Sequence, residues 1–456
     1  MAKRTLLATT FGLIFNVPVS NRTATSLIWL FRAALVSLTV CFLLAGFTSA
    51  ALGQQQPDPR LLTFINSIRV IDNHCHDLPA PDAKYIERDL PDPIGKSLDF
   101  FDARQRETNP RWIQAWRALY GYTKQDLTQE HVGELFRAKQ RLMRDKGANY
   151  PAWVLDQIGI EVALVNAPQL GAGQSAPRFR WVPFADGFLF PFESRDPTGN
   201  VQRRRREIGL DKPPASLSEY LDQVVKRQLQ QWKSDGAIAI KFQIAYYRSL
   251  DFANVKENDA KAAYERFIQG GAPSGPDYKL LQDFLFRYVA REAGRLGLSV
   301  HIHTGEGGGP FFGTAGSNPL LLESVLNDYT LQGTIFVLVH GGYPFDRVVA
   351  SLIKKPNVYT DISGQSFFRS RDGLSETLQP WLEAFPEKIM FGTDAFELSP
   401  LRSWEEMAWI STKTGREALA LALTKMMTAG DITRPRAEEI ARMVMRENAT
   451  KLYGLK

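Results

Sequence analysis

The sequence predicts an α/β protein folded as a (β/α)8 barrel. Eight short runs rich in branched apolar residues recur from residue 70 onward, as expected for parallel strands covered on both faces. Helix-like patterns separate most of the runs, and eight strand–helix units favour a closed barrel over the alternative, an open doubly wound sheet. The predicted strands are residues 70–76, 161–166, 181–185, 237–242, 298–303, 335–340, 357–362 and 388–393.

Residues 1–53 are expected to be a signal peptide or a membrane anchor, and residues 54–456 the barrel domain. Basic residues precede an apolar run over 33–47, and small residues then lead to residue 53, which is typical of signal-peptidase cleavage. The alternative is an uncleaved anchor, since residues 26–51 are long enough to span a membrane, although Arg32 favours cleavage. Both interpretations predict export to the periplasm or the medium, with membrane attachment in the second.

Composition and charge predict a globular core and give no reason to expect a nucleic-acid partner. Apolar residues make up 44% of the chain and charged residues 23%. The formal charge of +6 includes four cations and no acid within residues 1–53, so the remainder carries only +2. The four arginines at 203–206 are predicted to form a solvated loop. A small molecule is the expected partner, and the sequence does not indicate an oligomeric state.

Helical periodicity fills most gaps between the strands. Ser216 is the expected N-cap of a helix whose apolar residues recur at helical spacing as far as Trp232. Residues 167–180 are too short and too rich in Gly, Pro and Gln for a full helix. Further helices are predicted over 127–146, 280–289, 345–353, 374–385, 416–429 and 435–453.

The gap after the first strand, residues 77–150, is far too long for an ideal barrel. It contains several tryptophans and tyrosines followed by a helical stretch. An insertion at this point of a barrel emerges at the face that carries the active site. It is predicted to be either a lid or pocket wall that selects the substrate, or a helical pair that covers exposed barrel surface.

The first strand carries a His-x-His motif. His74 and His76 are two residues apart, so on an extended strand both imidazoles point to the same face. Two imidazoles aimed at one point are typical of a site for a zinc-like ion. Cys75 points to the opposite face and is expected to pack in the core.

Further candidate residues lie at the carboxyl ends of later strands, where barrel active sites are built. Lys241 ends the fourth strand, His303 the fifth, His340 the sixth, and Asp394 follows the eighth. His301 lies two residues before His303 and is therefore expected deeper in the barrel, as a hydrogen-bonded interior histidine.

These residues make the chain resemble the amidohydrolase superfamily. That superfamily combines His-x-His on strand one with a histidine on strand five, another on strand six and an aspartate on strand eight. From residue 70 onward the chain is most similar to the amidohydrolase-related (amidohydrolase 2) domains fused to glutamine synthetase in some plants and fungi. The motifs that carry the similarity are Ile-Lys at 240–241, Tyr-Tyr-Arg at 246–248, His-Thr-Gly at 303–305, Ser-Asn-Pro-Leu at 317–320, His-Gly-Gly-Tyr-Pro-Phe at 340–345, Asn-Val-Tyr-Thr-Asp-Ile at 357–362 and Thr-Asp at 393–394.

The resemblance implies a centre with one or two divalent ions, zinc or manganese. Such an ion lowers the pKa of a bound water and makes a hydroxide nucleophile. Asp394 is implied to take the water's proton and return it to the leaving group, and His340 to polarise the carbonyl or bind a second ion. Lys241 is either a carboxylated lysine that bridges two ions or a lysine in an ion pair or hydrogen bond. The implied ligands are His74, His76, Lys241, His303, His340 and Asp394, with Asp394 and His340 catalytic.

The predicted function is metal-dependent hydrolysis of an amide or related carbonyl bond. The first alternative is a metal-dependent carbon–carbon lyase, a decarboxylase or hydratase, on the same barrel. The second is a non-catalytic exported binding protein. The presence of every implied metal ligand in the sequence argues against this alternative.

Several residues near the strand ends are expected to play supporting roles. Residues 306–309 form a glycine-rich loop expected to contact the substrate. Arg248 and Tyr246 follow the fourth strand and are predicted to bind a substrate carboxylate. Asp361 is expected to cap a turn, and His131 to be a surface residue on a helix.

Overall fold

The computed structural model describes residues 55–78, 80, 90–98, 101–192, 199–270 and 275–455. The predicted targeting segment, residues 1–53, lies outside this part of the chain and stays a prediction. Residues 57–456 form one compact unit. Among the described residues, no helix is both long and apolar enough to cross a membrane.

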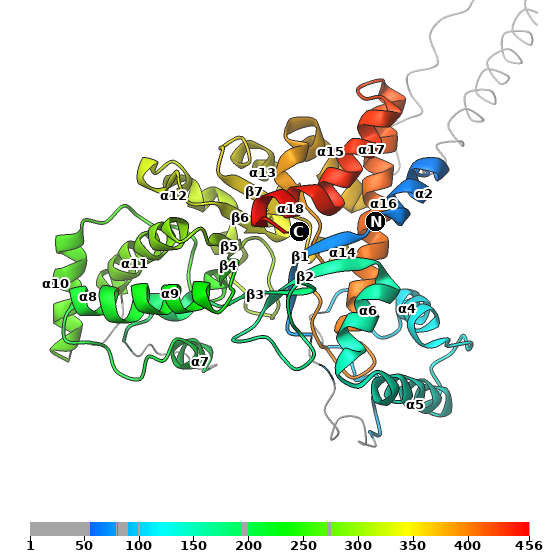
Figure 1. Cartoon of the computed structure of the whole chain (residues 1–456), viewed down its shortest axis with the longest axis horizontal. Coiled ribbons are helices and arrows are strands. Elements are labelled where there is room, and N and C mark those ends of the chain that lie inside the picture. Colours follow the sequence, from blue (N-terminus) through cyan, green and yellow to red (C-terminus); the bar gives the residue numbers. More distant parts are fainter. Residues whose placement is uncertain are drawn as a thin grey trace, which may run out of the picture. The chain divides into compact units, whose positions relative to one another are not determined.

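Eight parallel strands follow one another in chain order within the described residues (Figure 1). Backbone hydrogen bonds join them into a three-stranded sheet, β1 to β3, and a five-stranded sheet, β4 to β8. All eight strands fall at or beside the predicted runs, so the predicted barrel is confirmed. The strands are β1 Val70–His76, β2 Ile160–Asn166, β3 Phe179–Val182, β4 Ala239–Phe242, β5 Ser299–His303, β6 Phe336–Val339, β7 Val358–Asp361 and β8 Ile389–Met390.

Two seams between the sheets close the barrel. At the β3–β4 seam the amide of Lys241 donates to the carbonyl of Pro183 at 2.8 Å. At the β8–β1 seam the amide of Asp394 donates to the carbonyl of His74 at 2.7 Å. The second seam places the residue that follows the last strand beside the first strand, so residues from opposite ends of the barrel sequence meet there.

The eighth strand is shorter than the predicted run of six residues. Only Ile389 and Met390 pair with β7. The residues after them turn to β1, where the amide of Thr393 donates to the Asp72 carboxylate at 2.8 Å instead of to a backbone carbonyl of that strand. A buried side chain therefore replaces part of the ladder at this seam.

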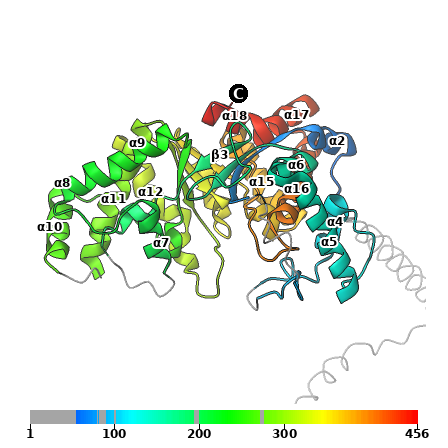
Figure 2. The same cartoon turned by 60° about the horizontal axis from the view of Figure 1, so that its bottom comes forward.

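Helices surround the strands, with α7 to α11 gathered at one side and α4, α5, α6 and α16 at the other (Figures 1 and 2). Ser216 is the N-cap that was predicted, since its hydroxyl accepts from the amide of Glu219 at 3.2 Å. The segment between α8 and α9 continues as a π-helical stretch, Tyr220–Lys226. The helices are α2 Pro59–Ser67, α4 Pro110–Tyr120, α5 Gln129–Lys146, α6 Tyr150–Ile158, α7 Asn200–Glu207, α8 Leu217–Glu219, α9 Arg227–Ser234, α10 Glu257–Ile268, α11 Gly275–Arg295, α12 Glu323–Leu326, α13 Asp346–Leu352, α14 Gln365–Phe368, α15 Arg371–Ala384, α16 Trp404–Ala429, α17 Arg434–Arg442 and α18 Asn448–Tyr453.

Helix α16 begins at Trp404, well before the predicted start at residue 416. Ser403 and Glu406 form a capping box, in which each side chain satisfies a backbone amide of the first turn. The early turns bury residues on several faces, so they lack the one-sided apolar stripe on which the prediction depended.

The insertion after β1 packs against the barrel through its helices and also lines the pocket, whereas its predicted role in selecting the substrate stays a prediction. Its helices α4 and α5 pack near α16, where the Trp116 indole donates to the carbonyl of Leu401 at 2.7 Å. Lys139 of α5 forms a buried ion pair with Glu406 at 3.1 Å. The segment around residues 98–105, which precedes α4, instead lines the pocket described below.

The predicted solvated loop at residues 203–206 is wrong. These arginines belong to α7, and two of them, Arg204 and Arg205, are only 4% and 3% exposed. Arg204 is paired with Glu207 at 2.6 Å, and Arg205 donates to the carbonyls of Pro191 and Asp211. A guanidinium can be buried when its Nη groups have such partners, which a charge run does not reveal.

Candidate metal centre and active-site pocket

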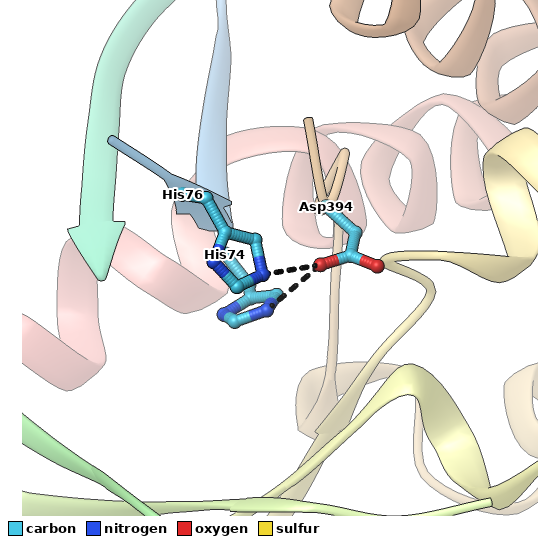
Figure 3. Close-up of side chains that lie close together, drawn as sticks. All are labelled: His74, His76 and Asp394. Carbon is cyan, nitrogen blue, oxygen red and sulfur yellow. Dashed lines mark ion pairs between the residues drawn. The ribbon is translucent and has the colours of Figure 1, made fainter. Parts of the chain in front are cut away.

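Three side chains from β1 and the end of β8 converge on one point (Figure 3). The Nε2 atoms of His74 and His76 lie 3.1 Å and 3.2 Å from the same carboxylate oxygen, Oδ1 of Asp394. The ligand atoms of the three residues all lie within 4.8 Å of one another. The two-residue spacing on β1 aims both imidazoles at one face, and barrel closure supplies the carboxylate.

Asp394 and His340 adopt backbone conformations that non-glycine residues rarely occupy. Their φ angles are +58° and +70°, in the left-handed region. Each is held there by a hydrogen bond: the amide of His340 donates to Asp361 at 2.9 Å, and the amide of Asp394 to the carbonyl of His74. Such strain persists where surrounding contacts fix it and is typical of functional sites.

Two glycines leave room for these side chains. Gly364 has a φ of +69°, and an added Cβ would lie 3.1 Å from Nδ1 of His340 and 3.3 Å from Oδ2 of Asp394. At Gly341, with a φ of +57°, an added Cβ would overlap the Trp381 ring at 2.2 Å. The close packing of the backbone around His340 therefore depends on glycine at both positions.

His303, His340 and Lys241 border the group of three. The rings of His303 and His340 lie 4.5 Å apart, and Nδ1 of His340 is 3.9 Å from Oδ2 of Asp394. Nζ of Lys241 lies 3.4 Å from Nε2 of His74. The predicted ligand and catalytic residues thus gather at one end of the barrel, although the tight cluster contains only two of the histidines and the aspartate.

Burial controls the protonation of this group. It lowers the pKa of His74 and of His340 well below the usual value and that of Lys241 to about 8. Burial also raises the pKa of Asp394, but the opposing effects of His340 and the hydrogen bonds from His74 and His76 hold it well below its usual value. Neutral imidazoles beside an ionised carboxylate are the donors that a divalent ion requires.

A pocket of about 640 Å³ opens above the cluster. Its floor includes His76, Lys241, His303, His340 and Asp394. One wall is apolar and comes from the insertion, the loop after β8 and α14. The other carries the loop at 306–309 that was predicted to contact substrate. The apolar wall consists of Leu98, Phe101, Phe368, Phe396 and Leu398.

Residues 210–455 match the family model described as Amidohydrolase. The chain belongs to this family. A curated relative, Protein fluG of Emericella nidulans, is 27% identical over 230 residues, which is 48% of this chain and 26% of fluG. The chain therefore spans about a quarter of that relative.

Solved structures show the same fold at low sequence identity. A protein from Lactobacillus casei, provisionally assigned as a metal-dependent hydrolase, aligns with a TM-score of 0.62 and 18% identity over 88% of this chain and 98% of its own. Uronate isomerase from Thermotoga maritima aligns with a TM-score of 0.63 and 15% identity over 86% and 96%, and glucuronate isomerase from Caulobacter crescentus with 0.60 and 16% over 87% and 93%. These likenesses establish the architecture of the amidohydrolase barrel.

The donors of the amidohydrolase site fit a divalent cation. Apart from Lys241, every candidate donor is an imidazole nitrogen or a carboxylate oxygen, the atoms that zinc binds in proteins. Nε2 of His303 is buried and has no hydrogen-bond partner among the described residues, and Oδ1 of Asp394 faces the Nε2 atoms of His74 and His76. A buried nitrogen without a partner is costly, and a cation bound beside it would satisfy it.

A second layer of polar residues orients the histidines, and the sequence prediction missed most of it. Nδ2 of Asn166, at the end of β2, lies 2.7 Å from Nδ1 of His74, and this contact orients the ring with Nε2 toward Asp394. Asp361 does more than cap a turn, because it accepts from the amides of both His340 and Ser363. The position of Asp361 at the end of β7 was the feature of the sequence that could have indicated this supporting role.

Cys75 and His301 lie where they were predicted. Cys75 is fully buried, and its thiol donates to the carbonyl of Leu164 at 3.4 Å. His301 is an interior residue with Nε2 2.8 Å from the Tyr453 hydroxyl.

The predicted carboxylate-binding role of Arg248 is wrong, because this residue pairs with buried Asp283 at 2.6 Å and is not among the residues that line the pocket. Tyr246 does line the pocket, with its ring 4.8 Å from that of His303. His131 lies on α5 with Nδ1 2.6 Å from Asp126 and is not part of the pocket lining.

Proposed function

We propose that the protein is a metal-dependent hydrolase that cleaves an amide or related carbonyl bond of a small molecule. The observation that carries this proposal is the convergence of His74 and His76 on one oxygen of Asp394, at the floor of a pocket large enough for a small molecule. Membership of the amidohydrolase family supports the same chemistry.

The chain's own residues supply binding and proton transfer. A divalent ion held by His74, His76 and Asp394, with His303 as a further ligand, would act as a Lewis acid and lower the pKa of a bound water. Asp394 has a second oxygen, Oδ2, that faces His340 and is suited to hold the proton of the attacking water and return it to the leaving amine. His340 is neutral at pH 7 and can donate a hydrogen bond to the developing oxyanion.

Lys241 admits two roles that differ in metal content. Burial lowers its pKa to about 8, which favours the neutral amine that carboxylation needs. A carboxylated Lys241 would bridge two ions, whereas an unmodified one would sit beside a single ion as a hydrogen-bonding partner of His74. Two ions per chain would support the bridge, and one ion would support the unmodified amine.

Elemental analysis of the purified protein, of His74→Ala and of His131→Ala tests the metal centre. We expect one or two ions per chain in the wild type and in His131→Ala, because His131 lies outside the pocket lining, and a loss of most metal in His74→Ala. Wild-type protein that takes up no metal after incubation with zinc or manganese would contradict the proposal.

The reaction class is tested on a panel of N-acyl amino acids and simple acyl amides, assayed for released amine and for carbon dioxide. Amine release that is lost in His74→Ala and retained in His131→Ala is the expected result. Release of carbon dioxide from aromatic or unsaturated acids, without amine release, would instead identify a lyase.

A further inference from the structure

Arg204 is a buried cation directly behind the pocket. Its guanidinium stacks on the ring of Phe184 at 3.6 Å, and that ring in turn stacks on His76 at 6.5 Å. Glu207 pairs with Nη1 of Arg204 at 2.6 Å. Burial of a guanidinium is costly unless its donors are used, and Nε of Arg204 has no partner among the described residues, so the partner of Nη2 is informative.

That partner is Gln243, a pocket residue. Gln243 follows β4 two positions after Lys241, and both side chains line the pocket. Oε1 of Gln243 accepts from Nη2 of Arg204 at 2.8 Å, and its backbone amide donates to the carboxylate of Asp186 at 3.0 Å. The residue is thus fixed at both its backbone and its side chain.

The contact with Arg204 determines which end of the Gln243 amide faces the pocket. A guanidinium has only donors, so the amide atom next to it must be the oxygen. The NH2 group therefore points away from Arg204, and it has no hydrogen-bond partner among the described residues.

We infer that Gln243 is a substrate-binding residue, held by Arg204 so that its NH2 group donates to a carbonyl or carboxylate oxygen of the substrate. The inference rests on the proposed function and adds a specificity contact to it. Glu207 and Asp186 lie close to Arg204 and offset its charge, so the pocket presents an oriented neutral donor at this point.

Kinetics of four variants test the contact with the best N-acyl amino acid of the panel. We expect Gln243→Leu to lower kcat/KM about 10- to 100-fold, mainly through KM, because the substrate oxygen loses its donor. Arg204→Met should lower it about 3- to 10-fold, because the amide is then free to rotate. The double variant should be no worse than Gln243→Leu, since Arg204 acts through Gln243.

Arg205→Met is the matched control. Arg205 is equally buried on the same helix but donates to backbone carbonyls and does not line the pocket. A fall in kcat/KM for Arg205→Met as large as that for Arg204→Met, or effects of Arg204→Met and Gln243→Leu that multiply, would overturn the inference.

Binding of 3-phenylpropanoate and of its amide, measured by calorimetry on metal-loaded protein, separates this inference from the proposed function. Weaker binding of both probes to Gln243→Leu indicates a carbonyl contact, and weaker binding of the acid alone indicates a carboxylate contact. Binding that depends on Gln243 without any hydrolysis of the panel would reject the hydrolase and retain the contact. Equal binding to wild type and Gln243→Leu, or no binding to wild type, would reject the contact.

Discussion

At the scale of single residues, the site depends on glycines that leave room for the neighbouring side chains as well as on the side chains of the cluster. Gly364 is the clearest case, since its position next to both His340 and Asp394 admits no Cβ without displacing one of them. The conformation is also left-handed, so any substitution adds backbone strain.

We expect Gly364→Ala to lower metal affinity and kcat/KM at least tenfold and the free energy of unfolding by about 1–2 kcal/mol. Gly121→Ala is the control, because Gly121 has the same φ of +69° with no atom within 4 Å of an added Cβ. Metal titration, kinetics and urea unfolding of both variants check the prediction. Equal losses of metal affinity in the two variants would show that only backbone strain matters.

His301 links protonation to stability. Burial, and secondarily Lys241, lowers the pKa of His301 to about 3, whereas the unfolded chain titrates near the ordinary value of 6.5. Below pH 6.5 His301 is therefore protonated in the unfolded chain but stays neutral in the folded protein. The free energy of unfolding consequently falls as the pH falls from 6.5 toward 3.

His301→Gln should remove this contribution. Between pH 7 and pH 5, the metal-free wild type should lose about 2 kcal/mol more unfolding free energy than the variant. Urea unfolding in the presence of a chelator at both pH values measures the difference. The same pH dependence in both proteins would mean that His301 does not contribute.

The sequence was sufficient for the residues whose position follows from strand periodicity alone. His74 and His76 share a face because they are two apart on a strand, and a histidine or aspartate at a strand end must face the barrel mouth. Asn166 and Arg204 were missed because their roles depend on which residue lies across the barrel, which no local pattern encodes.

At the scale of elements, strands were easier to predict than helices. Buried parallel strands are short apolar runs whose composition is local, whereas α16 buries several faces and α7 buries two arginines, so neither shows a one-sided apolar stripe. The length of the insertion was evident from the sequence, but its division into packing helices and a pocket wall was not.

The pocket wall formed by the insertion is fastened by one buried side chain, Arg402. It donates to the carbonyls of Ile94, Gly95 and Gln105 and to the Ser97 hydroxyl, at 2.9–3.1 Å. The four contacts span the segment on both sides of Leu98, so they hold the wall against the loop after β8.

Arg402→Met should loosen this segment and raise KM about 3- to 10-fold with a smaller effect on kcat, because residues of the wall line the pocket and none of them belongs to the metal-ligand cluster. Limited proteolysis should also cut more rapidly between residues 94 and 105. Arg434→Met, which breaks a surface ion pair with Asp58, is the control. An unchanged KM in Arg402→Met would show that the wall does not contact substrate.

At the scale of the whole molecule, the C-terminal helix is joined to the site through the barrel interior. The Tyr453 hydroxyl donates to Oδ1 of Asn73 at 2.6 Å and accepts from Nε2 of His301. The Asn73 amide donates to Asp361 at 2.6 Å, and Asp361 accepts from the backbone of His340. The chain of hydrogen bonds therefore runs from α18 to a candidate catalytic residue.

Tyr453→Phe should lower the free energy of unfolding by about 1–3 kcal/mol, because Oδ1 of Asn73 and Nε2 of His301 both lose their hydrogen bond to the hydroxyl. Thermal and urea unfolding measure the loss. Lys451→Ala on the same helix, at an exposed position, should be neutral. A Tyr453→Phe protein as stable as the wild type would show that the interior hydrogen bonds carry no net stabilisation.

The seam between β8 and β1 has a consequence for biosynthesis. The ribosome makes the two histidines of the cluster early and Asp394 only near the end, so a nascent chain would lack the carboxylate donor of the proposed metal centre until β8 has been made. If the cluster holds an ion as proposed, products truncated before Asp394 would retain it less firmly than the full chain, and their metal content would distinguish them from it.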